Sequence, residues 1–333
     1  MPEVIKHEAP ILIIGDRMAS RLETFKDQLA KKISEHIPGT VKIQYITSEG
    51  QNIHRSLEAF KKMDRLPLLT IILSNSDEGF EELIKPQSLK NTLSNIDLYN
   101  DINIQSLLIV FPEMSRLIYK NVDYQVLGPT IRPRENEVSA DLHFYHQKAL
   151  FKLYEASLNN FFEYAKKRAS FVLPVTTPIN LKRPPKKSCY GSLDKEGRVE
   201  LKTVIESFQK KDFKSAFNLS RELVLLYPNN AQVLYLHSQI LYRLNDYTQA
   251  HRYGEKAVAM DCGLKTGNPI YNEIMKKAAS KHNFPTFDYH SYLADESTNN
   301  HVFIEEIYPQ DFYLGKLTDV LAIKIQKLLK LDR

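Results

Sequence analysis

One short segment that recurs at a fixed distance constrains the fold of this chain more than any other feature. The segment DFKSA at residues 212–216 returns 34 residues later as DYTQA at residues 246–250. A repeat of this length is typical of stacked supersecondary units, each of which buries its apolar face against the next. The pattern around both segments is helical, so we expect stacked helix pairs in this part of the chain.

Before these repeats, the sequence alternates short apolar runs with helical stretches. We expect strands at residues 11–14, 41–46, 68–73, 106–111 and 170–175, and helices at residues 18–36, 52–63 and 139–167. Strands that alternate with helices predict a parallel sheet with helices on both faces. Ligands bind such sheets beyond the carboxyl ends of the strands, where residues 15–17, 74–77 and 176–180 are expected to lie.

After the repeats, the strand pattern returns at residues 284–288 and 302–309, and a helix is expected over residues 315–331. We therefore predict an all-α insertion within a discontinuous α/β domain. The α/β domain would span residues 1–188 and 283–333, and the helical insertion residues 189–282. The helix expected at residues 268–281 could extend the repeats as a cap.

Composition limits the class of protein. The 333 residues are 43% hydrophobic and 26% charged, as in globular proteins of about two domains. A formal charge of +5 is too small to argue for nucleic acid, and no apolar run reaches the ~18 residues that cross a membrane. Cys189 and Cys262 match neither a zinc spacing nor a disulfide framework, so we expect a cytoplasmic protein.

Between the strand at 170–175 and the repeats lies a basic, proline-containing stretch. Lys182, Arg183, Lys186 and Lys187 surround two prolines there. Such a composition is typical of a solvated linker, with a basic docking patch as the alternative.

The helical part resembles the tetratricopeptide family. The small residues of the second repeat are Ser238, Ala250 and Ala257, whereas Leu223 and Cys262 depart from the consensus. The resemblance implies a concave surface that binds an extended peptide or a partner helix. Candidate residues to line or rim this surface are Tyr235, His237, Tyr242, Arg243 and His251. Packing of the helix pair is the alternative for the two tyrosines.

The α/β part resembles the SGNH, or GDSL-type, hydrolases, with a three-layer αβα sheet. The resemblance rests on four blocks of sequence, at residues 13–16, Gly50, residues 74–77 and residues 305–309. It implies a serine nucleophile after Gly-Asp, but Arg17 stands at this position and cannot attack a carbonyl. Tyr308 stands where a histidine base is implied, and Ser76 where an oxyanion-binding asparagine is implied, while Gly50 and the carboxylate of Glu305 are kept.

Several uses of this altered site stay open. Arg17 could pair with Glu305 and fill the site, or it could bind a small anion. Ser20 and His54 are conceivable as a relocated nucleophile and base. His143 and His146, three residues apart on a helix, could share a metal ion, but no third ligand is evident.

From these features we predict a catalytically inactive, SGNH-like protein without cofactor or metal. It would act as an interaction scaffold through its repeats, with another protein as its partner and without membrane insertion. The alternatives are an active esterase or acyltransferase with a relocated nucleophile, and a sensor that binds a small anion at Arg17. The sequence leaves the oligomeric state and the number of repeats open.

Overall fold

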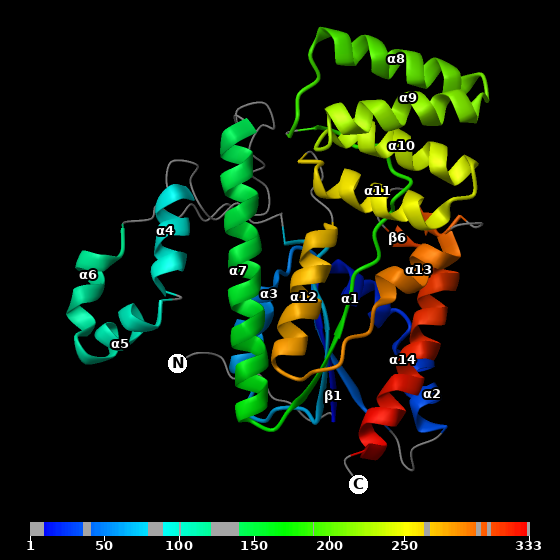
Figure 1. Ribbon diagram of the computed structural model, residues 1–333. Helices are drawn as coiled ribbons and strands as arrows, with labels where there is room; N and C mark the ends of the chain where they lie inside the picture. The colour runs from blue at the N-terminus through cyan, green and yellow to red at the C-terminus, as the bar shows by residue number, and fades with distance from the viewer. Residues whose placement is uncertain are drawn as a thin grey trace.

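A four-stranded parallel sheet forms the centre of the α/β domain in the computed structural model of this chain (Figure 1). The structure describes residues 10–35, 41–78, 89–99, 101–120, 140–188, 190–262, 267–297, 301–304 and 308–331. The sheet order is β2-β1-β3-β4. The strands are β1 (Ile11–Gly15), β2 (Ile43–Thr47), β3 (Leu69–Leu73) and β4 (Phe171–Val175). A parallel bridge from Val175 to Phe287 extends the sheet beyond β4.

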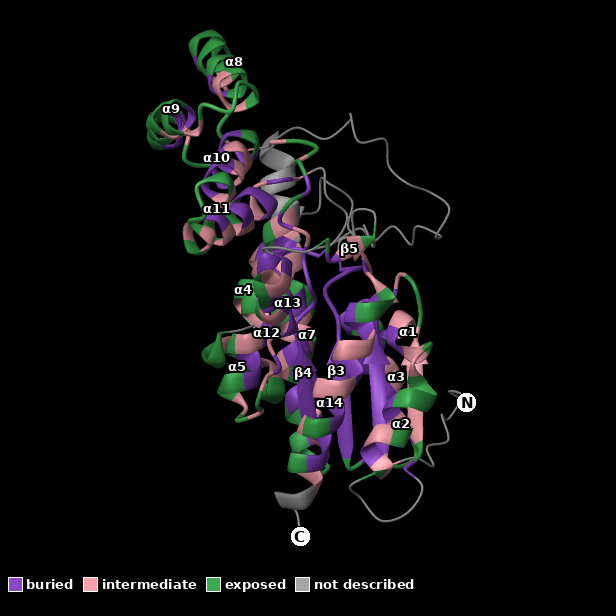
Figure 2. Ribbon diagram, turned by 90° about the vertical axis from the view of Figure 1, so that its right-hand side faces the viewer, coloured by how far each residue is buried: buried purple, intermediate pink, exposed green. Residues whose placement is uncertain are grey.

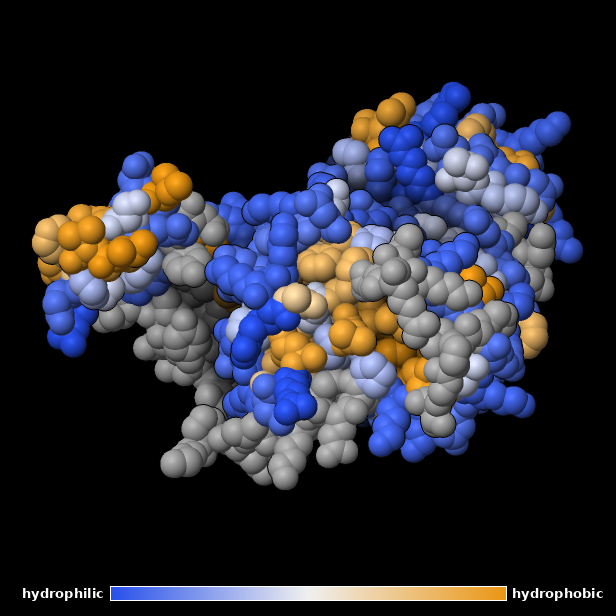
Figure 3. Space-filling view, turned by 90° about the horizontal axis from the view of Figure 1, so that it is seen from below, coloured by the Kyte–Doolittle hydropathy of each residue, from blue (hydrophilic) through white to orange (hydrophobic). Residues whose placement is uncertain are grey.

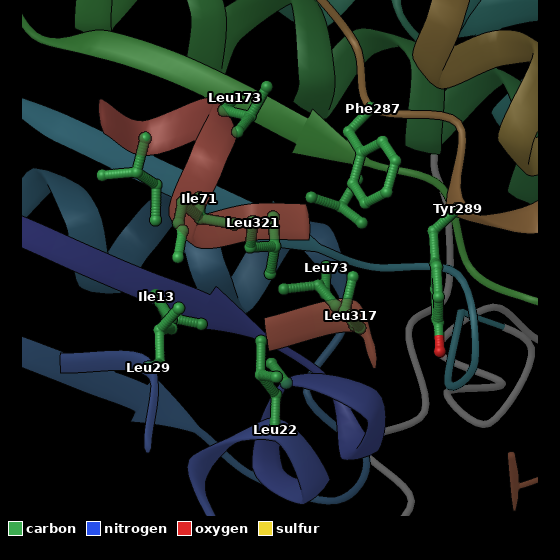
Figure 4. Close-up of a cluster of buried hydrophobic side chains, with 14 of the residues drawn as sticks. Ile13, Leu22, Leu29, Ile71, Leu73, Leu173, Phe287, Tyr289, Leu317 and Leu321 are labelled. Atoms are coloured by element: carbon green, nitrogen blue, oxygen red, sulfur yellow. The ribbon is translucent and has the colours of Figure 1, made fainter. Parts of the chain in front are cut away.

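Helices cover both faces of this sheet. Alternate residues of β1 point to opposite faces, so Ile11 and Ile13 join one apolar core and Leu12 and Ile14 the other. The first core is completed by α1 (Arg17–Glu23), α2 (Lys26–Ser34), α13 (Tyr289–Ser297) and α14 (Asp311–Leu331) (Figure 4). The second is completed by α3 (Ile53–Lys61), α7 (Ala140–Lys167) and α12 (Pro269–Lys281). The structure therefore confirms the predicted α/β class with a parallel sheet.

Four helices between β4 and α12 form a stack that projects from the α/β domain (Figure 1). They are α8 (Lys195–Gln209), α9 (Phe213–Leu226), α10 (Ala231–Arg243) and α11 (Tyr247–Ala259), and each packs against the next. The repeated aspartates have the same local role, because Asp212 and Asp246 both cap the helix that follows by accepting a backbone N–H three residues later. The 34-residue offset thus marks two equivalent helix starts.

Two predicted boundaries differ from the structure. The predicted helix at residues 18–36 is divided into α1 and α2 by a turn at Thr24 and Phe25. The helix expected as a possible cap of the repeats, α12, instead packs mainly on α7 and places Tyr271 and Met275 in a core of the α/β domain. Its apolar side chains complete the layer over the sheet, so it serves the α/β domain rather than the stack.

Two predicted strands do not join the sheet. Residues 106–111 fall within and just after α5 (Ile102–Val110), which Asp101 caps by accepting the backbone N–H of Asn103. A short apolar run fits a strand or a helix equally well, and the cap favours the helix here. Within the predicted strand at 302–309, β5 (Phe303–Ile304) and β6 (Tyr308–Pro309) pair with each other and, among the described residues, with no strand of the four-stranded sheet.

The segment around α5 exposes apolar side chains on one side of the molecule (Figure 3). It contains α4 (Leu89–Tyr99), α5, a 3-10 turn (Pro112–Met114) and α6 (Ser115–Ile118). Ile109 and Leu117 are more than four-fifths exposed. The expectation of a buried strand is therefore wrong in burial as well as in secondary structure.

Two findings bear on the environment of the chain. Cys262 is disulfide-bonded, which corrects the expectation of unpaired cysteines; Cys189, the other cysteine, lies outside the described residues. No helix in the described parts has the length and apolar character that crossing a membrane requires. The cytoplasmic location stays a prediction.

Candidate functional site

The candidate site lies at the carboxyl edge of the sheet, where β1, β3 and β4 end side by side. Gly15 closes β1 at a point where only glycine fits, because a Cβ there would lie 1.7 Å from the carbonyl oxygen of Leu73. This close approach brings the loop after β1 against residues 74–77 after β3. The structure thus places together the first and third sequence blocks.

Asp16 ties these two loops together. Its buried carboxylate accepts the backbone N–H groups of Met18 at 2.9 Å, Asn75 at 2.9 Å and Ser76 at 2.6 Å. Burial, and secondarily the nearby charge of Asp77, raises the pKa of Asp16 to about 7, although the three N–H donors lower it. Asp16 is therefore a structural anchor for both loops.

Asp77 is the centre of the site. One of its carboxylate oxygens accepts the backbone N–H of Arg17 at 3.2 Å and that of Gly50 at 2.9 Å. The other oxygen is paired with the Arg17 guanidinium. Burial lowers the pKa of Arg17, but Asp77 and, to a smaller degree, Tyr308 more than offset this, so the pKa of Arg17 is raised. An amide pair and a guanidinium from separate segments thus hold one internal carboxylate.

A third acid, Glu78, lies just behind Asp77. Its carboxylate accepts the backbone N–H of Ile53 at 2.8 Å and the hydroxyl of Ser74. Burial is the main cause that raises the pKa of Glu78 to about 8. The hydroxyl of Tyr154 donates to the Ser74 carbonyl at 3.1 Å, so this acid and its neighbours are held by hydrogen bonds from α3, α7 and the loop after β3.

Two asparagines connect the site to α12 and to the loop after β4. Asn75 donates to the side-chain oxygen of Asn272 at 2.8 Å, and Asn272 in turn exchanges hydrogen bonds with the backbone of Thr177 at 2.8 and 3.0 Å. All three residues are buried. The edge of the sheet is therefore a continuous polar network rather than an open surface.

The structure brings together four of the five positions that the sequence indicated. Arg17 and Gly50 both donate hydrogen bonds to Asp77, and the backbone N–H of Ser76 donates to Asp16. Tyr308 lies beside Arg17. Glu305 lies outside the described residues, so its expected pairing with Arg17 is not seen; the observed partner of Arg17 is Asp77.

Sequence reasoning missed the roles of Asp77 and Glu78. Both follow a buried strand at the edge where ligands of such sheets bind, and this position was the available signal. The predicted relocated pair does not form a dyad, since no hydrogen bond joins half-buried Ser20 to exposed His54 in the structure. The side chains of His143 and His146 lie outside the described residues, and the described part holds no group of three or more potential metal ligands.

The five residues predicted to bind a partner have different surroundings. Arg243 is exposed, and Tyr235, Tyr242 and His251 are half-buried. His237 is a packing residue, buried between helices with its Nδ1 2.8 Å from the Ser220 hydroxyl. Burial lowers the pKa of His237 to about 4, so this ring is neutral at physiological pH.

This geometry limits what the sheet edge can bind. Arg17 and the amides of Arg17 and Gly50 suit a carboxylate, and Asp77 of the same chain already occupies them. An external anion would have to displace a buried, ion-paired side chain.

No family model and no curated protein matches this sequence. One solved structure, from Bacteroides fragilis and described as a "putative acylhydrolase", is similar at a TM-score of 0.39 and 11% identity, over 98% of this chain and 91% of that chain. The prediction that this protein is not an enzyme is contradicted by that finding, and we withdraw it. A match this distant carries no argument about the reaction or the substrate.

Proposed function

We propose that α8–α11 form a tetratricopeptide-like module that binds another protein. The small residues of the repeat support this assignment, because Ser238 and Ala250 are fully buried where α10 crosses α11. The Ser238 hydroxyl donates to the Ala250 carbonyl at 2.7 Å, which a larger side chain at either position would prevent. The close helix pair is thus built from the residues that carry the resemblance.

The observation that carries the proposal is the exposed apolar surface of the end pair, α8 and α9. Val199 is 62% exposed, Leu225 76% and Leu226 64%. Figure 2 shows these two helices largely exposed, at the far end of the stack from the sheet. The ends of repeat arrays are normally polar, so uncovered apolar side chains there indicate a surface that a partner covers.

For the α/β domain we infer an SGNH-like organisation. Its support is the convergence of the Arg17 and Gly50 amides, from the first and second sequence blocks, on one carboxylate oxygen. The resemblance implies that these two amides face an oxyanion, and here they face Asp77. Binding through α8–α9 is independent of the chemistry of this domain.

The test is a double substitution, Leu225→Asp with Leu226→Asp, in the full chain. Ile323→Asp on α14 is the matched control, because Ile323 is 53% exposed on the α/β domain. Purified, tagged proteins are cross-linked in an extract of the source cells, and the captured proteins are quantified by mass spectrometry. We expect at least one protein that wild type and control capture to fall about tenfold with the double variant, since two buried charges weaken an apolar contact strongly. Equal capture by all three chains contradicts the proposal.

A further inference from the structure

The linker that enters the helical stack packs against it. This strap, residues 179–187, runs from the end of β4 past α12 and α13 to α11 (Figure 1). A solvated linker was expected, and Lys182, Lys186 and Lys187 are indeed exposed, but Leu181 is 4% and Arg183 8% exposed. Leu181 packs with Val258 of α11. It also lies close to Gly254 of the same helix, since a Cβ atom added at this glycine would be 3.1 Å from the Leu181 Cβ. The strap is therefore held on the stack by specific contacts.

The strap also contacts one face of α10. Tyr235, Gln239 and Tyr242 are spaced i, i+4 and i+7, so they lie on the same side of the helix, which we name the α10 face. The Tyr235 hydroxyl donates to the Lys182 carbonyl at 2.9 Å. The Lys182 ammonium lies 5.5 Å from the centre of the Tyr242 ring, within cation–π range. One strap residue thus contacts both ends of this face.

The fit between the strap and the α10 face is incomplete. Among the residues that the structure describes, the Gln239 side-chain nitrogen and the Tyr242 hydroxyl are buried without a hydrogen-bond partner. So is the Nε2 atom of His251, whose ring lies 5.6 Å from that of Tyr242. Buried polar groups without partners raise the free energy of the strapped state. These atoms suit the backbone N–H and C=O groups of an extended chain, which the strap does not supply.

The Lys182 ammonium donates a hydrogen bond to the Ser297 carbonyl, so the cation of the strap is held by a neutral acceptor and not by a carboxylate. Burial lowers the pKa of Lys182, and the positive charge of Arg243 lowers it further. Lys182 forms none of the ion pairs in the described part of the chain. The nearby carboxylate of Glu255 on α11 contacts His290 of α13 instead. The strap is thus an adequate occupant of the α10 face but not an optimal one.

We infer that the α10 face is the binding site for an extended segment of a partner protein, and that the strap is its internal competitor. This inference rests on the proposed function and names the class of partner. The strap shows the chemistry required: an apolar side chain at the position of Leu181, followed by a basic residue at that of Lys182. Displacement of the strap lets the partner backbone pair with Gln239 and Tyr242.

The experiment uses a fluorescent peptide that copies residues 177–188, titrated into the full chain and followed by anisotropy. The double variant Leu181→Ser with Lys182→Ser weakens the contact of the strap with the helical stack, and the wild-type chain is the reference. We expect the strap variant to bind the peptide at least tenfold more tightly, because an internal segment competes at a high effective concentration. A peptide with the same two substitutions is the matched control and should bind neither protein. Circular dichroism checks that the variant is folded.

Four results would overturn the inference. Equal affinity of both proteins for the peptide would show that the strap does not compete, and equal binding of the control peptide would show that the contact is not specific. A wild-type dimer that the peptide dissociates would assign the face to a second copy of this chain. If capture of a partner is lost on changing Leu225 and Leu226 but is insensitive to the peptide, the proposed function stands and this inference fails.

Discussion

The sheet edge and the α10 face differ in how completely their buried polar groups are hydrogen-bonded. At the sheet edge, the carboxylates of Asp16, Asp77 and Glu78 all accept hydrogen bonds, and Asp77 neutralises Arg17, so every charged group of that network is satisfied although the Thr177 hydroxyl is buried without a partner in the described structure. At the α10 face, the side chains of Gln239 and Tyr242 have buried atoms without partners in the described structure. A satisfied network stabilises one conformation, whereas an unsatisfied one marks a contact that another chain can improve.

This difference separates two kinds of candidate site. The sheet edge carries two backbone amides and a guanidinium that suit an anion, but Asp77 of the same chain occupies them. The α10 face is also filled by its own chain, but by a segment whose contacts are partial. We therefore expect substitutions at the sheet edge to affect folding most, and substitutions at the α10 face to affect binding most.

The largest expected effect is that of Asp77→Ala. It leaves the Arg17 guanidinium, whose side chain is 12% exposed, without its counter-charge and removes the acceptor of two amides. Breaking a buried ion pair in this way should lower the free energy of unfolding by about 3–5 kcal/mol, measured by urea denaturation. Asp311→Ala, which removes an exposed pair with Arg21, should cost less than about 1 kcal/mol. Similar losses for the two variants would remove the distinction between the sites.

The pH dependence of stability tests the same network. The pKa values of Asp16 and Glu78 are raised to about 7 and about 8, so the folded chain holds more protons than the unfolded chain. Stability should therefore fall as the pH rises from 6.5 to 8, by about 2 kcal/mol. The His237 pKa of about 4 opposes this trend only below pH 6.5.

Glu78→Gln isolates the contribution of one acid to this profile. The substitution should remove more than half of the fall in stability between pH 6.5 and 8, because an amide does not titrate. Urea denaturation of the wild type and the variant at each pH measures this. A profile that rises over this range, or an unchanged profile in the variant, would contradict the assignment.

An intermediate effect is expected at the strap. Leu181→Ala removes a side chain that is 4% exposed and should lower the free energy of unfolding by about 2–3 kcal/mol. Leu225→Ala, at a leucine that is 76% exposed, should change it by less than about 0.5 kcal/mol. Thermal unfolding of both variants measures the difference. Equal values would mean that the strap is not docked in solution.

The smallest effect gives the most direct comparison. Tyr154→Phe removes a hydroxyl that donates to the Ser74 carbonyl and should cost about 1 kcal/mol. Tyr242→Phe removes a hydroxyl that has no partner in the described structure, so stability should stay within about 0.5 kcal/mol or rise. Urea denaturation of the two variants side by side measures both. An equal loss in both would show that Tyr242 has a partner in solution.

Local pattern predicted much of the fold. The runs that became β1 to β4 were predicted because buried parallel strands are continuously apolar, and the repeated DFKSA and DYTQA segments were predicted to be helical. Local pattern failed for α5, whose apolar residues fit a strand as well as a helix, and for α12, whose apolar face suits either neighbour. Which neighbour covers a segment is not a property of its own sequence.

By itself, the sequence determined the parallel sheet, the polar loops at its carboxyl edge and the helical character of the repeated segments, since each depends on the periodicity or spacing of nearby residues. The tertiary structure decided which groups meet. Arg17 pairs with Asp77, 60 residues away, and Tyr235 bonds to Lys182, 53 residues away. Such pairs are set by the packing of whole elements, which brings together residues that no local pattern relates.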